Sequence, residues 1–121
     1  MPMQRTTLVT MRHGSDDEAT LRDLVRGLVA RFDPDELWLF GSRAEGGERP
    51  GSDWDILAVL PDTTPADVLD PVKASRRASD LGVALDVVPC TATEFAEERD
   101  EPGSLVWRVS TRGRRIYERR A

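Results

Sequence analysis

Residues 37–60 read LWLFGSRAEGGERPGSDWDILAVL and contain two apolar runs separated by a glycine-rich connection. The first run ends at Gly41-Ser42, and the second begins within Asp53-Trp54-Asp55. Side chains of a β-strand alternate between its two faces, so Asp53 and Asp55 are expected on one face and Trp54 on the other. This stretch therefore predicts two strands, with a pair of carboxylates at the start of the second.

Paired carboxylates on a largely buried strand repel each other, and their placement is costly unless a cation or a shared proton offsets the repulsion. Mg²⁺ is the usual cation for an all-oxygen site. A third carboxylate, Asp86, interrupts the apolar run over residues 83–88. We therefore predict that Asp53, Asp55 and Asp86 are catalytic and bind metal. The alternatives are a solvated face for Asp53 and Asp55, and a cap or turn position for Asp86.

Length and composition restrict the class of protein. A chain of 121 residues is expected to form one domain with a modest core, and 39% hydrophobic and 32% charged residues fit a soluble globular protein. No stretch is long enough to span a membrane, the N-terminus lacks a signal-peptide core, and the single cysteine allows no internal disulfide. A cytoplasmic protein without membrane contact is expected. The net charge of −5 argues against direct nucleic-acid binding.

A long amphipathic helix is predicted before the first strand. After a polar leader over residues 1–14, Ser15 and Glu18 have the form of a capping box, and apolar residues then recur at spacings of three and four up to Phe32. The connection between the strands at 36–40 and 53–60 is shorter than the crossover that parallel strands need. These two strands are therefore predicted to be antiparallel neighbours.

The second half of the chain predicts further alternation of helices and strands. Turn and capping residues place a helix from Asp70-Pro71 to Leu81-Gly82, a strand at 83–88 that stops at Pro89, a short helix capped by Thr91 or Thr93, helical turns around 105–109 and an edge strand at 115–117. The predicted class is α/β (α+β) in the order α-β-α-β-α-β-α. A small mixed sheet of three to four strands would be flanked by helices within one domain, residues 15–121.

The turn after the first strand suggests an anion site. Gly41 permits a sharp turn and close approach of a ligand, and Ser42 is predicted to cap a short helix whose amide groups remain free for an anion. Arg43 would add a charged donor, and Ser52 is assigned to the same nucleotide site. An exposed helical arginine and a simple turn serine are the alternatives for Arg43 and Ser52.

An anion site one strand away from a cation site implies a ligand that carries both, and a nucleoside triphosphate with magnesium meets that description. Two Mg²⁺ ions held by the aspartates would support an in-line displacement at phosphorus. Asp86 would take the proton of the acceptor hydroxyl as general base.

The runs at residues 40–44 and 51–56 resemble the signature of the DNA polymerase beta-like nucleotidyltransferase superfamily, in particular that of the minimal nucleotidyltransferase (MNT) proteins. Residues 81–88 likewise resemble the segment that holds the third acidic residue of that family. The resemblance covers residues 15 to 117, most of the chain. Glu45 and Trp54 depart from the residues that are commonest at those positions, and neither departure removes a metal ligand.

The resemblance implies a nucleotidyltransferase fold and a Mg²⁺-dependent transfer of AMP from ATP to an acceptor. Larger relatives carry a helical domain that holds the acceptor, and a chain of this length leaves no room for one, so a partner must supply it. Minimal relatives commonly act as antitoxins that add AMP to a tyrosine of a HEPN ribonuclease toxin. AMPylation of such a toxin within a homo- or hetero-oligomer is therefore the leading hypothesis. The alternatives are a non-catalytic binding module and a small-molecule nucleotidyltransferase.

Overall fold

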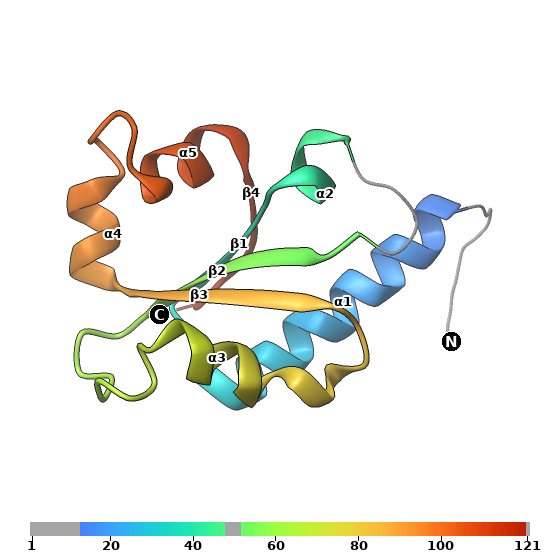
Figure 1. Cartoon of the computed structure of the whole chain (residues 1–121), viewed down its shortest axis with the longest axis horizontal. Coiled ribbons are helices and arrows are strands. Elements are labelled where there is room, and N and C mark those ends of the chain that lie inside the picture. Colours follow the sequence, from blue (N-terminus) through green and yellow to red (C-terminus); the bar gives the residue numbers. More distant parts are fainter. Residues whose placement is uncertain (1–12, 48–51, 121) are drawn as a thin grey trace.

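The computed structural model describes residues 13–47 and 52–120. Within these ranges a four-stranded mixed sheet is flanked by helices, which confirms the predicted class (Figure 1). The helices are α1 (His13–Phe32), α2 (Ser42–Glu45), α3 (Pro71–Arg77), α4 (Ala92–Glu98) and α5 (Leu105–Arg112), with a 3₁₀ turn, η1, at Ser79–Leu81. The strands are β1 (Glu36–Phe40), β2 (Trp54–Leu60), β3 (Leu85–Thr91) and β4 (Arg114–Glu118).

The strands lie in the order β3-β2-β1-β4. As predicted, β1 and β2 are antiparallel neighbours, and β4 adds to the other side of β1 as an antiparallel edge strand. Strands β2 and β3 are parallel, because the connection that carries α3 and η1 is long enough for a crossover. The interior position of β2 explains why its residues 56–60 are all apolar and all buried.

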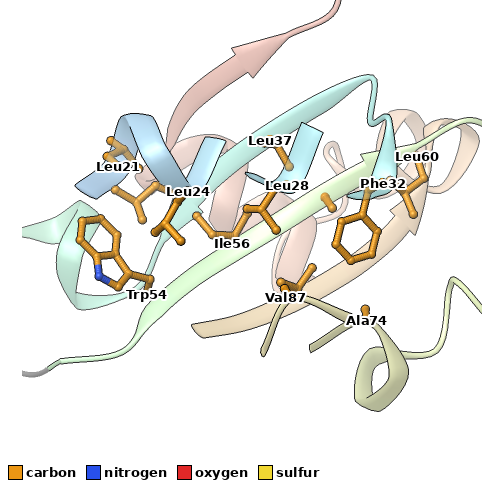
Figure 2. Packing of buried hydrophobic residues seen from close by; sticks show 13 residues of the cluster. Leu21, Leu24, Leu28, Phe32, Leu37, Trp54, Ile56, Leu60, Ala74 and Val87 are labelled. Atoms are coloured by element: carbon orange, nitrogen blue, oxygen red, sulfur yellow. The ribbon is translucent and has the colours of Figure 1, made fainter. Parts of the chain in front are cut away.

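One face of the sheet is covered by α1 and α3. In the long helix the apolar residues fall on one side, and Figure 2 shows Leu24 and Leu28 lying against Ile56 of β2. Trp54 packs in the same cluster and is only 5% exposed, so it belongs to the core. The buried members of this cluster are Leu21, Leu24, Leu28, Phe32, Leu37, Leu39, Trp54, Ile56, Ala58, Leu60, Ala74, Ala78 and Val87.

The opposite face of the sheet is covered by α4 and α5. The alternate residues of the strands point to this side, and Phe95 of α4 and the two valines of α5 close over them. The buried members of this second cluster are Trp38, Leu57, Val59, Cys90, Phe95, Val106 and Val109. Asp55 precedes Leu57 by two residues, so the carboxylate of Asp55 lies on the face of α4 and α5.

Two predicted helix boundaries are wrong. Helix α1 begins at His13, so Ser15 lies within its first turn and is not the capping residue; the leader at residues 1–12 falls outside the described residues. Helix α3 ends at Arg77, and the chain continues through η1 to Gly82, which has a φ of 85°. The predicted start of α3 is confirmed, because the Asp70 side chain accepts a hydrogen bond from the Lys73 amide.

The prediction that the third strand stops at Pro89 is also wrong, since β3 continues to Thr91. Proline is tolerated there because β3 lies at the edge of the sheet and needs no hydrogen-bond donor on its open side. Thr91 then caps α4 in a capping box with Glu94, as one of the two predicted alternatives. Among residues 13–47 and 52–120, no helix is both long and apolar enough to cross a membrane.

Candidate active site

Two of the three predicted aspartates meet across neighbouring strands. Asp55 of β2 and Asp86 of β3 are register partners in the parallel pair, so their side chains leave the sheet on the same face and at the same height. Asp53 lies one residue before β2. Asp53 and Asp86 are exposed and Asp55 is half-buried. Asp55 is therefore the innermost carboxylate of the three.

The charges of these groups interact. Burial raises the pKa of Asp55 above its ordinary value, and the negative charges of Asp86 and Asp53 raise it further. A cation placed beside Asp55 would relieve all of these unfavourable contributions. Over the described ranges, no three His, Cys, Asp or Glu side chains are already gathered as metal ligands. The structure thus provides a carboxylate pair on β2 and β3, with Asp53 one residue before β2.

The oxygen donors of this site suit a hard divalent cation. Carboxylates without thiol or imidazole groups are the ligand set that Mg²⁺ prefers. Asp55 and Asp86 leave adjacent strands side by side, and Asp53 lies two residues before Asp55. The residues present therefore fit a magnesium site.

Gly41 lies against the Asp55 carboxylate. Its φ of 75° and ψ of −158° belong to a region that only glycine adopts readily. A Cβ atom built on Gly41 would overlap the Asp55 carboxylate oxygen, so a larger residue would displace that side chain. The Asp55 carboxylate thus occupies the space that a side chain on Gly41 would need.

The prediction that Ser42 caps the short helix is wrong. Gly41 is the capping residue, and no side chain bonds the first turn of α2. The Gly41 carbonyl accepts hydrogen bonds from the amides of Ala44 and Glu45, both at 3.1 Å. Ser42 is the first residue of the helix and is exposed beside Gly41. The turn lies where the sequence predicted it, and the capping position is one residue earlier than predicted.

Arg43 and Ser52 lie together on the side of Trp54. The Arg43 guanidinium donates to the Ser52 carbonyl at 3.0 Å, lies 4.1 Å from the centre of the Trp54 ring and is 3.6 Å from Asp17 of α1. The Arg43 side chain is only 11% exposed. Trp54 and Asp55 point to opposite faces of β2, so the structure does not bring Arg43 together with the aspartates.

A cleft of about 540 Å³ opens over Asp55 and Asp86. Ser75 of α3 lies at its side, where the Ser75 hydroxyl accepts a hydrogen bond from the Val87 amide at 3.0 Å and donates to the Val87 carbonyl at 3.4 Å. These bonds join α3 to the open edge of β3, one residue from Asp86. The other lining residues are apolar and belong to the two core clusters or to α3 and α5. They are Phe40, Pro71, Val72, Val87, Val88 and Leu105.

A smaller cavity of about 220 Å³ adjoins this cleft and shares Phe40 and Leu105 with it. Gly41 and Arg108 both line this cavity, together with Glu45 and Gly113. Arg108 is exposed, and its side chain makes no hydrogen bond or ion pair with any other described residue. A cationic side chain is therefore available next to the Gly41 turn.

Four residues that line the site were not predicted from the sequence: Val72, Ser75, Leu105 and Arg108. Each lies on α3 or α5, and none stands in a motif. Another groove, of about 580 Å³, lies between α1 and β4 and contains none of the three aspartates. We assign the site to the cleft that contains the carboxylate pair.

The chain is similar to one known family and to solved structures. The family described as nucleotidyltransferase domain matches residues 21–109, which include Gly41 and all three aspartates. A crystal structure of a toxin–antitoxin with AMP-PNP is 23% identical, with a TM-score of 0.54 over 83% of this chain and 74% of that chain. A candidate nucleotidyltransferase from Sulfolobus solfataricus is 22% identical, with a TM-score of 0.53 over 89% and 91%. The two structures share the fold. The comparison with curated proteins gives no match.

Proposed function

The chain belongs to the nucleotidyltransferase domain family, and from this premise we propose that it transfers AMP from ATP to a hydroxyl group of a partner protein. The observation that carries the proposal is the pairing of Asp55 with Asp86 against the Gly41 turn. The similar toxin–antitoxin structure contains AMP-PNP, which supports the choice of nucleotide and of an antitoxin role. We propose a HEPN toxin as the partner and a tyrosine as the acceptor.

The three aspartates would hold two Mg²⁺ ions in this proposal. When bound, the metal would neutralise the triphosphate and lower the pKa of the acceptor hydroxyl. Asp55 is the proposed central metal ligand, because it is the innermost acid and the negative charges of both other acids act on it. Asp86 lies on the adjacent strand, on the side of α3, and would accept the hydroxyl proton as general base.

The triphosphate would bind along the Gly41 turn. The missing side chain of Gly41 lets a phosphate approach the backbone, and the exposed Ser42 begins the helix beside it. We propose that Arg108, which lines the cavity at Gly41, supplies the cation that the sequence analysis had assigned to Arg43. Arg43 and Ser52 would instead hold the turn from the opposite side of β2.

The transfer assay that tests this proposal combines the chain with the protein encoded by the adjacent gene, ATP and Mg²⁺. Mass spectrometry should show the addition of AMP to a tyrosine of the partner. A chain that binds ATP yet leaves the partner unmodified would refute the transferase assignment.

Replacement of Asp53 and Asp55 by asparagine separates catalysis from binding. The double variant should retain its fold, lose AMP transfer and fail to neutralise the partner. Full neutralisation by the double variant would identify a non-catalytic antitoxin.

A further inference from the structure

Two exposed apolar side chains flank the acidic cleft. Val72 is 65% exposed and Leu105 is 43% exposed, and they are the exposed large hydrophobic residues among the described parts of the chain. They belong to different helices, α3 and α5, and both line the cleft that holds Asp55 and Asp86. Apolar side chains that line a cleft together with a few polar groups suit a ligand-binding site.

The cleft is amphipathic. Phe40 and Val88 extend the apolar lining inward, where both pack against the second core cluster. The polar groups are confined to Asp55, Asp86 and Ser75. A ligand that fits must therefore carry an apolar body and place a single polar group at the carboxylates.

Resting on the proposed function, we propose that Val72 and Leu105 form an apolar clasp for the ring of a tyrosine acceptor on the partner protein. A phenol places its hydroxyl at the far end of a flat apolar ring, so the ring would contact the two exposed side chains while the hydroxyl reaches Asp86. A serine hydroxyl lies one carbon from its backbone and offers no such body. A ribose acceptor carries hydroxyl groups around its ring and offers no flat apolar face.

The clasp would orient the acceptor for a balanced transfer. The phenolic oxygen forms a bond to the α-phosphorus of ATP, and the bond from that phosphorus to the oxygen bridging to the β-phosphate breaks. Pyrophosphate leaves with the electron pair of the broken bond. The phenolic proton passes to the Asp86 carboxylate and then to water.

Binding of small acceptor probes tests the clasp without any transfer. The full chain is titrated with N-acetyl-tyrosinamide and with N-acetyl-serinamide, and the methyl NMR signals of Val72 and Leu105 are followed. The tyrosine probe should shift both sets of signals in a saturable manner, and the serine probe should shift neither. Equal responses to the two probes, or no response to either, would overturn the clasp.

Kinetics with the partner protein test the same residues in the reaction. Val72→Ser and Leu105→Ser should each raise the KM for the partner about tenfold and leave kcat unchanged. Val72→Ser should also leave the affinity for AMP-PNP unchanged, because Val72 does not line the cavity at Gly41. The control is Lys73→Ser, which removes a neighbouring exposed side chain that does not line the cleft.

The outcomes distinguish the two proposals. A wild-type chain that transfers AMP with unchanged kinetics in both serine variants would overturn the clasp and leave the proposed function standing. A drop in AMP-PNP affinity with an unchanged KM for the partner would assign Val72 and Leu105 to the nucleobase and also overturn it. Transfer to an RNA end in place of the partner's tyrosine would do the same. A wild-type chain without any transfer would refute the proposed function, while the probe titration would still decide the clasp.

Discussion

At the scale of single residues, Gly41 shapes the site through the side chain that it lacks. Its backbone adopts a conformation that other residues avoid, and the space of its absent Cβ atom is occupied by the Asp55 carboxylate. Substitution here therefore has two separate costs. One is backbone strain, and the other is displacement of a proposed metal ligand.

A matched pair of glycine variants separates these costs. Gly41→Ala and Gly46→Ala both force alanine into a positive φ, but a Cβ on Gly46 has no atom within 4 Å. Each should lower the free energy of unfolding by about 1–2 kcal/mol in urea denaturation. Only Gly41→Ala should also reduce AMP transfer, by about a hundredfold or more, because it displaces Asp55. Equal activity in the two variants would show that the contact with Asp55 is unimportant.

The residues predicted from sequence fall into two groups. Strand periodicity was sufficient to place Asp55 on a defined face. The apolar residues on either side of Asp86 indicated that this acid also lies on a strand. Arg43 shows the limit of this approach. Its position one residue after Ser42 suggested a phosphate contact, but its direction depends on Trp54 and Asp17, which only the folded chain brings together.

At the scale of elements, α3 protects the open edge of the sheet next to the site. Strand β3 has a neighbour on one side only, so the amide and carbonyl of Val87 would be unpaired without Ser75. The single hydroxyl of Ser75 serves both groups. Ser75 thereby holds the backbone adjacent to Asp86, which makes it a positioning residue for the carboxylate.

Ser75→Ala should cost about 1–2 kcal/mol of stability, because the Val87 amide loses its partner. The control is Ser110→Ala, since the Ser110 hydroxyl only donates to a carbonyl within its own helix at 3.1 Å and leaves no amide unpaired. Urea denaturation measures both variants. Mg²⁺ affinity should fall in Ser75→Ala and stay unchanged in Ser110→Ala, and an equal loss in both would contradict the positioning role.

Helix and strand identities were more predictable than their ends. Capping residues such as Asp70 and Thr91 act through contacts three residues away, which a sequence displays directly. Pro89 misled the prediction because its effect depends on whether the strand lies at an edge or in the interior. That property belongs to the assembled sheet and cannot be read from neighbouring residues.

At the scale of the whole molecule, the gathering of acids in the site lowers the stability of the metal-free fold. Asp55 is placed where burial and two other negative charges raise its pKa. A carboxyl whose pKa is higher in the folded than in the unfolded state stabilises the fold below the unfolded value and loses that contribution as the pH rises through the folded value. At neutral pH, ionised Asp55 therefore weakens the metal-free protein.

Asp55→Asn should consequently stabilise the metal-free chain by about 0.5 kcal/mol at pH 7, a size reduced by solvent screening of a partly exposed group. The difference from the wild type should disappear below pH 3.8, the ordinary pKa of the group. Addition of Mg²⁺ should raise the Tm of the wild type and leave that of Asp55→Asn nearly unchanged. Thermal denaturation measures both effects.

The control for this experiment is Asp67→Asn, which alters an exposed aspartate without a hydrogen bond or ion pair to other described residues. It should match the wild type in stability and in its response to Mg²⁺. A wild-type chain that is more stable than Asp55→Asn in the absence of metal would show that the carboxylates do not repel each other.

The parallel register of β2 and β3 also limits how this scaffold can change in length. A single residue inserted between Asp55 and Leu60, or deleted between Asp86 and Thr91, would turn alternate side chains toward the wrong face and expose apolar residues. Insertions are tolerable only in the connections between elements. A new recognition module can therefore be joined to this chain only within a connection between elements. Insertions that arise in evolution face the same restriction.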